Sequence, residues 1–345
     1  MPQRGGTSRL ERMITELPKA ELHLHLEGTF EPELLLRIAK RNGVPIGHKS
    51  LAEIRKSYRF TDLQSFLDIY YAAMGALMED EDFRELTDAY LQKAASQGVR
   101  HAEIFFDPQA HTGRGVKFDK VVTGITAALS KSQRNYGISS SLIMCFLRDL
   151  SAASAEETLD RALSFKDEIS TVGLDSKEIG NPPRKFERVF RRARKEGFGA
   201  VAHAGEEAPP EYVWEALDVL KISRVDHGYR SMEDPKLVKR LAVDRTPLTA
   251  CPLASLGVHY FESISDFPLK RMLDANLLVS VHSDDPAYFG GYIVDNYVAA
   301  CRGLGLGEKE VLTLLRNSID SSFLEDGPRA RLLSEFDGAA RRLKA

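Results

Sequence analysis

The sequence has little cysteine and no excess of basic residues. Three cysteines occur among 345 residues, far apart and without a Cys-x-x-Cys pair. No disulfide framework is therefore expected, and a reducing compartment is indicated. The net charge of −3 argues against a nucleic-acid-binding surface. The one basic stretch, 182–197, is interrupted by acidic residues and is typical of a solvated helix face.

Long apolar runs are also missing. No stretch of about 18 apolar residues occurs, so we expect no membrane-spanning helix. The opening residues, MPQRGGTSRLERMITELP, lack the apolar segment of a secretory signal, and the expected location is the cytoplasm. Apolar residues make up 43% and charged residues 28% of the chain. This balance is typical of a folded globular protein, so extensive disorder is not expected.

Short apolar runs that end in polar residues alternate with amphipathic helical stretches. This alternation predicts a (β/α)8 TIM barrel spanning residues 1–345 as a single domain, with a doubly wound open sheet as the alternative. Residues 48–95 exceed a normal return helix and predict a helical insertion after strand 1 that forms a lid, and extra helices are expected after strand 8. The eight predicted strands are 20–28, 99–107, 139–149, 171–178, 199–206, 223–228, 246–254 and 277–285.

Histidines and carboxylates gather at the predicted carboxyl ends of these strands, where barrel enzymes carry their sites. Residues two apart in a strand share a face, so His23 and His25 are expected to point to the same place, opposite the neighbouring leucines. With His203 at the end of strand 5 and Asp284 at the end of strand 8, they form the expected metal ligands. Imidazole and carboxylate favour one Zn²⁺ per chain over iron or manganese.

Three further residues at this rim suit catalysis. His227 would hold and polarise a water at the metal, or else be a structural histidine. Glu206 follows His203 by three residues and would act as a general acid or base if burial raises its pKa. Asp285 would bind substrate, or else cap its loop.

At these residues the sequence resembles the adenosine/adenine deaminase family of the amidohydrolase superfamily. The matching stretches are LPKAELHLHLEGT, HAEIFFDPQAHT, GLDSKE, HAGEE, RVDHG, CPL and SDDPAYFGGY, in family order from residue 17 to about 292. The resemblance implies a zinc-dependent hydrolytic deaminase of a 6-aminopurine, with the four ligands above. It implies that Glu206 protonates N1, His227 orients the attacking hydroxide, and Asp285 bonds N7.

Within the family, the motifs are most similar to the adenine deaminase branch, which implies conversion of adenine to hypoxanthine and ammonia. Glu27 stands where adenosine deaminases have an aspartate used toward ribose, and the longer side chain would fill sugar space. Ser176 or Glu178 would reach the N3/N9 edge of the base, or else have a structural role in the loop. An N6-substituted adenine, adenosine and 6-aminodeoxyfutalosine remain alternative substrates.

Two departures from the family pattern lie next to the expected metal. Ala254 and Ser255 replace the usual Ser-Asn pair, and His282 replaces an asparagine. His282 shares a predicted face with Asp284 and is a competing ligand candidate. These changes would fit a different 6-substituent, a different electrostatic setting or weak activity on plain adenine.

Two other readings compete with the one-metal deaminase. Lys177 lies near the place where a two-metal amidohydrolase carries its bridging carboxylated lysine. The departures also leave open a catalytically impaired purine-binding protein. A cytidine-deaminase type of zinc site is excluded because its Pro-Cys-x-x-Cys signature is absent. The expected partner is a small purine, and a homo-oligomer is compatible with the sequence; neither nucleic acid nor membrane is expected.

Overall fold

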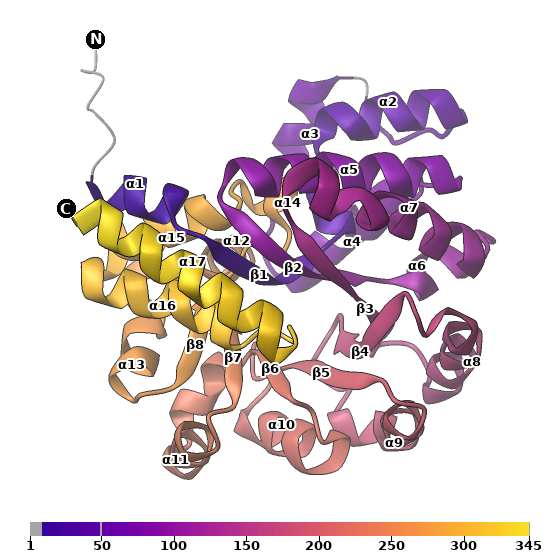
Figure 1. The fold of residues 1–345 in the computed structure, drawn as a ribbon. Helices are drawn as coiled ribbons and strands as arrows, with labels where there is room; N and C mark the ends of the chain where they lie inside the picture. Colours follow the sequence, from indigo (N-terminus) through magenta and orange to yellow (C-terminus); the bar gives the residue numbers. More distant parts are fainter. Residues whose placement is uncertain (1–8, 49, 345) are drawn as a thin grey trace.

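The computed structural model describes residues 9–48 and 50–344, which form a (β/α)8 barrel (Figure 1). The predicted domain 1–345 also includes residues 1–8, 49 and 345, which lie outside the described residues. Eight parallel strands of the described chain follow one another in sequence order around the sheet. They are β1 Lys19–His25, β2 Val99–Phe106, β3 Ser139–Leu147, β4 Ile169–Asp175, β5 Gly199–Ala204, β6 Arg224–His227, β7 Pro247–Ala250 and β8 Leu278–Val281.

The eight predicted strands are all present, but several predicted ends extended too far. Residues 27–29 form a short 3₁₀ turn rather than the end of β1. The predicted seventh strand ends at Ala250, and its last residues lie in a helix that starts at Pro252. Residues beyond the observed strand ends belong to the turns and helices that follow them.

The barrel closes between the loop after β8 and β1. Leu24 forms a parallel bridge with Asp284, which lies beyond the last residue of β8. The pairing of β1 with β2 also shifts by one residue, because Glu21 pairs with Ala102 whereas Leu24 pairs with Ile104. Such a bulge changes the direction of the side chains that follow it.

The bulge explains why strict alternation does not hold along β1. Alternation alone would put Glu21 on the face of His23 and His25. Instead the Glu21 carboxylate accepts a hydrogen bond at 3.0 Å from Tyr90 of the outer helix α5 (Asp80–Ser96). The register shift therefore separates the face of Glu21 from the face shared by His23 and His25.

Two hydrophobic clusters support the strands. A small cluster inside the barrel contains Phe105, Ile143, Cys145 and Val201. Phe105 makes an edge contact with His23, with ring centroids 5.1 Å apart, so this cluster forms the floor of the polar rim. The larger cluster lies between the strands and the surrounding helices. The three cysteines are buried and unpaired.

The helices that were predicted between the strands are present. Together with the shorter turns they form the outer layer of the barrel (Figure 1). The α-helices besides α5 are α1 Arg9–Glu16, α2 Pro32–Asn42, α3 Leu51–Ser57, α4 Leu63–Met74, α6 Pro108–Thr112, α7 Phe118–Tyr136, α8 Ala152–Ala162, α9 Glu187–Lys195, α10 Pro210–Glu215, α11 Pro235–Asp244, α12 Pro252–Gly257, α13 Leu269–Asp274, α14 Pro286–Phe289, α15 Ile293–Leu304, α16 Glu308–Asp320 and α17 Asp326–Lys344. The 3₁₀ and π turns are Glu27–Thr29, Leu163–Phe165, Pro183–Phe186, Ala216–Leu220, Tyr229–Glu233 and Ile264–Asp266.

The predicted insertion after strand 1 is present and divides into two parts. Helices α3 and α4 are additions to the basic barrel, and α4 contributes side chains to the space above the strands. Helix α5 packs beside α7 and acts as the return helix before β2 (Figure 1). Helices α15, α16 and α17 follow β8, as expected for extra C-terminal helices. Within the described residues, no helix is long and apolar enough to cross a membrane.

Candidate active site

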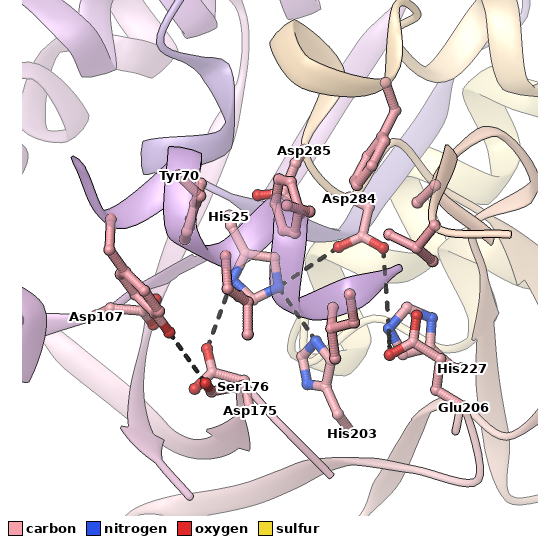
Figure 2. A pocket seen from close by; sticks show the side chains of 17 residues that line it. His25, Tyr70, Asp107, Asp175, Ser176, His203, Glu206, His227, Asp284 and Asp285 are labelled. Atoms are coloured by element: carbon pink, nitrogen blue, oxygen red, sulfur yellow. Dashed lines mark hydrogen bonds and ion pairs between the residues drawn. The ribbon is translucent and has the colours of Figure 1, made fainter. Parts of the chain in front are cut away.

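The four predicted metal ligands meet at the carboxyl end of the barrel. Figure 2 shows His25, His203 and Asp284 facing one another, and His23 lies beside them on β1. Asp284 is held there by backbone bonds to β1. Its amide donates to the His23 carbonyl at 3.1 Å, and its carbonyl accepts from the His25 amide at 3.1 Å. Asp284 has a left-handed φ of 62°, a strained conformation that clusters at functional sites.

The distances between the ligand atoms fit a single tetrahedral metal ion. His25 Nε2 lies 3.1 Å from His203 Nε2. Asp284 Oδ1 lies 3.3 Å from His23 Nε2 and 3.5 Å from His25 Nε2. Tetrahedral zinc with bonds of about 2.1 Å would separate its ligand atoms by about 3.4 Å. His23 Nε2 is buried and has no hydrogen-bond partner among the described residues. Its lone pair is therefore free to bind a metal ion.

The protonation of these histidines also suits a metal. Burial, aided by neighbouring histidines, lowers the pKa of His23 and His203 well below the usual value. Both imidazoles are therefore neutral at pH 7, and neutral imidazole is the form that binds metals. The donor set, its spacing and its charge state together define a candidate metal site.

A chain of buried polar groups beneath the site orients His23. Its Nδ1 lies 2.7 Å from Thr249 Oγ1, and the Thr249 hydroxyl donates to Asp226 Oδ1 at 3.1 Å. Thr249 therefore accepts from His23 Nδ1–H, which leaves Nε2 free for the metal. Arg224 Nε binds Asp226 at 2.9 Å, and Arg224 also pairs with Glu103. Sequence reasoning missed Thr249 and Arg224; the only signal was a polar residue within a buried apolar strand.

His227 lies beside the ligands and contacts Tyr229. The Tyr229 hydroxyl accepts from the Cys251 amide at 2.7 Å and lies 3.0 Å from His227 Nδ1, to which it can donate. His227 Nε2 faces the cavity, 3.5 Å from Glu206 Oε2 and 3.8 Å from Asp284 Oδ2. Burial lowers the pKa of His227 to about 4, so the imidazole is a neutral hydrogen-bond donor.

Glu206 extends from the loop after β5 into the same cavity (Figure 2). Burial is the largest cause that raises its pKa well above the usual value, and the nearby Asp284 adds to it. A carboxyl group that stays protonated near neutral pH can serve as a proton donor. The position of Glu206 and the direction of its pKa shift are those required of a general acid, and its catalytic role stays a prediction.

Asp285 lines the cavity next to Asp284, at the start of α14. Burial and the neighbouring Asp284 raise its pKa well above the usual value. Its Oδ1 is buried without a hydrogen-bond partner within the described chain. Gly28 makes room for this side chain, because a Cβ at Gly28 would lie 2.1 Å from Asp285 Oδ1 and 2.6 Å from Asp285 Cα. The Asp285 side chain therefore packs closely against Gly28, and its role toward the substrate stays a prediction.

The cavity has an empty volume of ≈ 480 Å³, a figure that includes the space open to solvent. One wall is polar: Asp107, Asp175 and Ser176 lie on the opposite side of His25 from Glu206 and His227 (Figure 2). The roof is apolar and comes largely from α4, as expected of the predicted insertion. Its cavity-facing residues are Leu63, Phe66, Leu67, Tyr70 and Tyr71.

Asp107 and Asp175 were not among the predicted site residues. Each offers a carboxylate oxygen within 4.8 Å of the other and of a His25 nitrogen. Burial and the mutual repulsion of these carboxylates raise the pKa of Asp107 well above the usual value. Both residues end a strand or immediately follow one, and this position was the signal that could have identified them.

The residues predicted to bind the base fall into three different places. Ser176 lines the cavity and accepts a hydrogen bond from Tyr71 of α4 at 3.1 Å. The buried Glu27 carboxylate lies 2.8 Å from His111 Nε2 and does not line the cavity, so its role toward the substrate stays a prediction. Glu178 is also outside the cavity lining, and its carboxylate is occupied by backbone amides of residues 205–208.

His282 is not placed as a ligand. Its Nδ1 accepts from the Leu22 amide at 3.0 Å, and its Nε2 lies 2.7 Å from Ser280 Oγ. Nδ1 thus links the end of β8 to β1, and Nε2 contacts a residue of β8 itself. Both ring nitrogens have partners, so His282 does not compete with the four ligands. His282 was expected to compete as a metal ligand because the predicted eighth strand ran to residue 285, which put His282 and Asp284 on one face. The strand ends at Val281 instead.

Lys177 does not occupy the position of a bridging lysine. Its side chain is exposed, and its amino group lies 3.5 Å from Gln64 Oε1 of α4. The side chain that the end of β4 contributes to the cavity is Asp175 instead. The two-metal reading therefore lacks its bridging group in this structure.

The altered Ser-Asn pair lies in α12. Ala254 lines the cavity, together with Val258 one turn later. The Ser255 side chain is buried and donates to the Cys251 carbonyl at 3.1 Å. The replacement makes this wall apolar and leaves the proposed metal and proton-transfer residues in place.

The barrel and its histidine-aspartate rim define a hydrolase of the amidohydrolase superfamily. Residues 18–339 match the family model described as adenosine deaminase. The chain is 56% identical over 338 residues to the adenine deaminase of Sphingopyxis alaskensis, covering 97% of this chain and 99% of the relative. The chain thus belongs to the adenosine deaminase family, most like its adenine deaminase branch, and is a hydrolytic deaminase.

Solved structures agree in fold. The crystal structure of adenine deaminase from Arthrobacter aurescens has a TM-score of 0.93 and 50% identity, covering 95% of this chain and 100% of that chain. An amidohydrolase from Burkholderia ambifaria with bound zinc has a TM-score of 0.88 and 26% identity, covering 99% of this chain and 97% of that chain. The similarity therefore extends over the whole barrel.

Proposed function

We propose that the protein is a zinc-dependent adenine deaminase, which hydrolyses adenine to hypoxanthine and ammonia. The observation that carries this proposal is the buried set of His23, His25, His203 and Asp284, with Glu206 and His227 beside it. Burial raises the pKa of Glu206 and lowers that of His227. The relatives named adenine deaminase, at 50–56% identity, support the choice of substrate.

The metal site suits one zinc ion, held by three imidazole nitrogens and one carboxylate oxygen. When bound there, zinc lowers the pKa of water and so makes a nucleophile available at neutral pH. His227 Nε2 lies 3.8 Å from Asp284 Oδ2, beside the metal site. With its proton on Nε2, His227 would donate to the attacking oxygen and orient it toward C6 of the base.

Glu206 transfers the proton that activates the ring. Its carboxyl donates to N1 as the water oxygen adds to C6. One proton of the water then reaches the amino group, the C6–N bond breaks and ammonia leaves, while the other proton returns to Glu206. The product keeps a carbonyl at C6 and a hydrogen at N1. This cycle needs no organic cofactor, and its atoms balance as adenine plus water.

The free base is preferred over a nucleoside because of the polar wall. Asp107, Asp175 and Ser176 face the cavity opposite Glu206, and the bond from Tyr71 to Ser176 joins the α4 roof to the loop after β4. A base that presents N1 to Glu206 would direct its N3/N9 edge toward this wall. Asp285, with its raised pKa, would donate to N7.

A substrate panel tests the proposal. The zinc-loaded protein is incubated with adenine, adenosine, N6-methyladenine, N6-isopentenyladenine and 6-aminodeoxyfutalosine, and release of ammonia or amine is followed. Adenine is expected to have the highest kcat/KM. Preference for adenosine or 6-aminodeoxyfutalosine would contradict the free-base assignment. Preference for an N6-alkyl base would instead mean that the apolar wall at Ala254 binds the alkyl group.

A further inference from the structure

Glu178 makes an unusual set of contacts for a buried carboxylate. It is 2% exposed and lies in the loop after β4. Oε1 accepts from the Gly205 amide at 2.7 Å, and Oε2 accepts from the amides of Glu206, Glu207 and Ala208 at 3.1, 2.9 and 2.9 Å. One side chain therefore binds four consecutive amides of the loop after β5.

The loop is shaped to receive this carboxylate. Gly205 has a left-handed φ of 71°, and a Cβ there would lie 2.6 Å from Val213 Cγ2. A left-handed residue within a turn directs successive amides into a concavity that binds an anion. Here the anion is the Glu178 side chain. The same loop carries the Glu206 carboxyl into the cavity, 3.5 Å from His227 Nε2.

Two arginines hold the carbonyl groups of the same segment. Arg148 Nη1 donates to the His203 carbonyl at 2.7 Å. The Arg230 amide donates to the Gly205 carbonyl at 2.8 Å, and its Nη1 donates to the Glu207 carbonyl at 2.7 Å. The arginines bind one side of the peptide groups and Glu178 binds the other, so the backbone that carries Glu206 is fixed from both sides.

We propose that Glu178 is a positioning residue for deamination, which fixes the backbone of residues 205–208 so that Glu206 meets N1 of the base. The inference rests on the proposed function, because it gives Glu206 the proton transfer. Both Glu178 oxygens are used by the loop, so Glu178 acts through the backbone that carries Glu206. An amide side chain at this position would offer one acceptor oxygen and bring an N–H donor against other N–H donors.

The test compares Glu178→Gln and Glu178→Ala with a control, Glu211→Gln, which changes an exposed acid just beyond the loop. Glu178→Gln is expected to lower kcat for adenine about 100-fold, since misplacing a reacting group by about 1 Å has that effect. KM and zinc content should stay as in the wild type. Amides 205–208 should exchange hydrogen faster, as measured by mass spectrometry, while Glu211→Gln changes neither quantity.

Three results would overturn the assignment. The first is wild-type kcat and wild-type amide exchange in Glu178→Gln. The second is a rise in KM with kcat unchanged, which would make Glu178 a substrate-binding residue. The third is loss of zinc in parallel with kcat, which would make it a support for His203. Should Glu178→Ala fail to fold, Glu178→Gln alone decides between these outcomes.

Failure of the proposed function is distinguishable from failure of this inference. If the wild-type protein does not deaminate adenine, the proposed function fails. The amide-exchange comparison would still show whether Glu178 holds the loop, and the kcat comparison would be repeated with whichever 6-aminopurine the wild type does deaminate.

Discussion

Thr249 Oγ1 lies 2.7 Å from His23 Nδ1, on the opposite side of the imidazole from the nitrogen that faces the metal site. The Thr249 hydroxyl in turn donates a hydrogen bond to Asp226 Oδ1 at 3.1 Å. Partners of this kind fix the tautomer and orientation of a metal-binding histidine. The affinity for the metal should therefore depend on a residue that does not touch it.

Replacing Thr249 with valine tests this dependence. The substitution keeps the shape of the side chain and removes its hydroxyl. His23 Nδ1–H then has no acceptor, and the contact that orients the imidazole ring is lost. We expect zinc affinity to fall by about 10- to 100-fold, as is usual when such partners are lost. Competition with a chelator measures it, and Thr313→Val, at an exposed position of α16, is the control. An unchanged affinity would show that Thr249 has no part in holding His23.

Glu206→Gln separates metal binding from proton transfer. Glutamine has nearly the same size but cannot donate an acidic proton to N1, so kcat for adenine should fall by about 10²- to 10⁴-fold. The zinc content should remain at the wild-type level, because Glu206 is not among the four ligands. Steady-state kinetics and metal analysis on the same preparation measure both. Retained turnover would remove Glu206 from the mechanism.

Gly28→Ala tests the placement of Asp285. The new Cβ would overlap both the carboxyl and Cα of Asp285, so the side chain must move away from the base. Loss of one hydrogen bond of about 1.5 kcal/mol predicts a decrease in kcat/KM of about tenfold. Gly327→Ala in α17, whose Cβ would meet nothing closer than 3.6 Å, is the control. Equal kinetics for both variants would argue against a substrate contact from Asp285.

The pKa of His227 predicts a pH dependence of stability. Burial lowers it from 6.5 to about 4, so between these values the unfolded chain binds a proton that the folded chain does not. The metal-free protein should therefore lose stability as the pH falls through this window, by about 3 kcal/mol for this one group.

Urea unfolding of the metal-free protein at about pH 7.5 and about pH 4.5 measures this effect. Carboxyl groups whose pKa is raised by burial, such as Asp107, stabilise the folded protein as the pH falls and so oppose this effect. Comparing the wild type with His227→Gln isolates the contribution of the histidine. The variant should lose less stability on acidification than the wild type. Equal losses would mean that His227 is not buried in its neutral form.

The sequence allowed the barrel and most of the rim to be predicted because both follow from local patterns. Each strand is an apolar run followed by polar residues, and His23, His25, His203 and Asp284 all lie at such ends. The bulge in β1 could not be predicted, since it depends on how Glu21 and Leu24 pair with β2.

Contacts between distant segments were likewise beyond prediction. His282 shares a residue type with the ligands, but the Leu22 amide and Ser280 occupy its ring. Glu178 has the chemistry of a substrate-binding group, but its carboxylate accepts hydrogen bonds from the backbone amides of the loop that begins at Gly205. In each case an alternative partner, brought close only by the folded barrel, decides the role of the residue.

The central claim is that one zinc ion and the Glu206–His227 pair deaminate a free purine base. The most direct measurement follows hypoxanthine and ammonia formed from adenine by protein of known metal content. The account predicts one zinc per chain, equal amounts of the two products, loss of turnover with a chelator and recovery with zinc. Two tightly held ions per chain, or no product from adenine with zinc fully loaded, would contradict it.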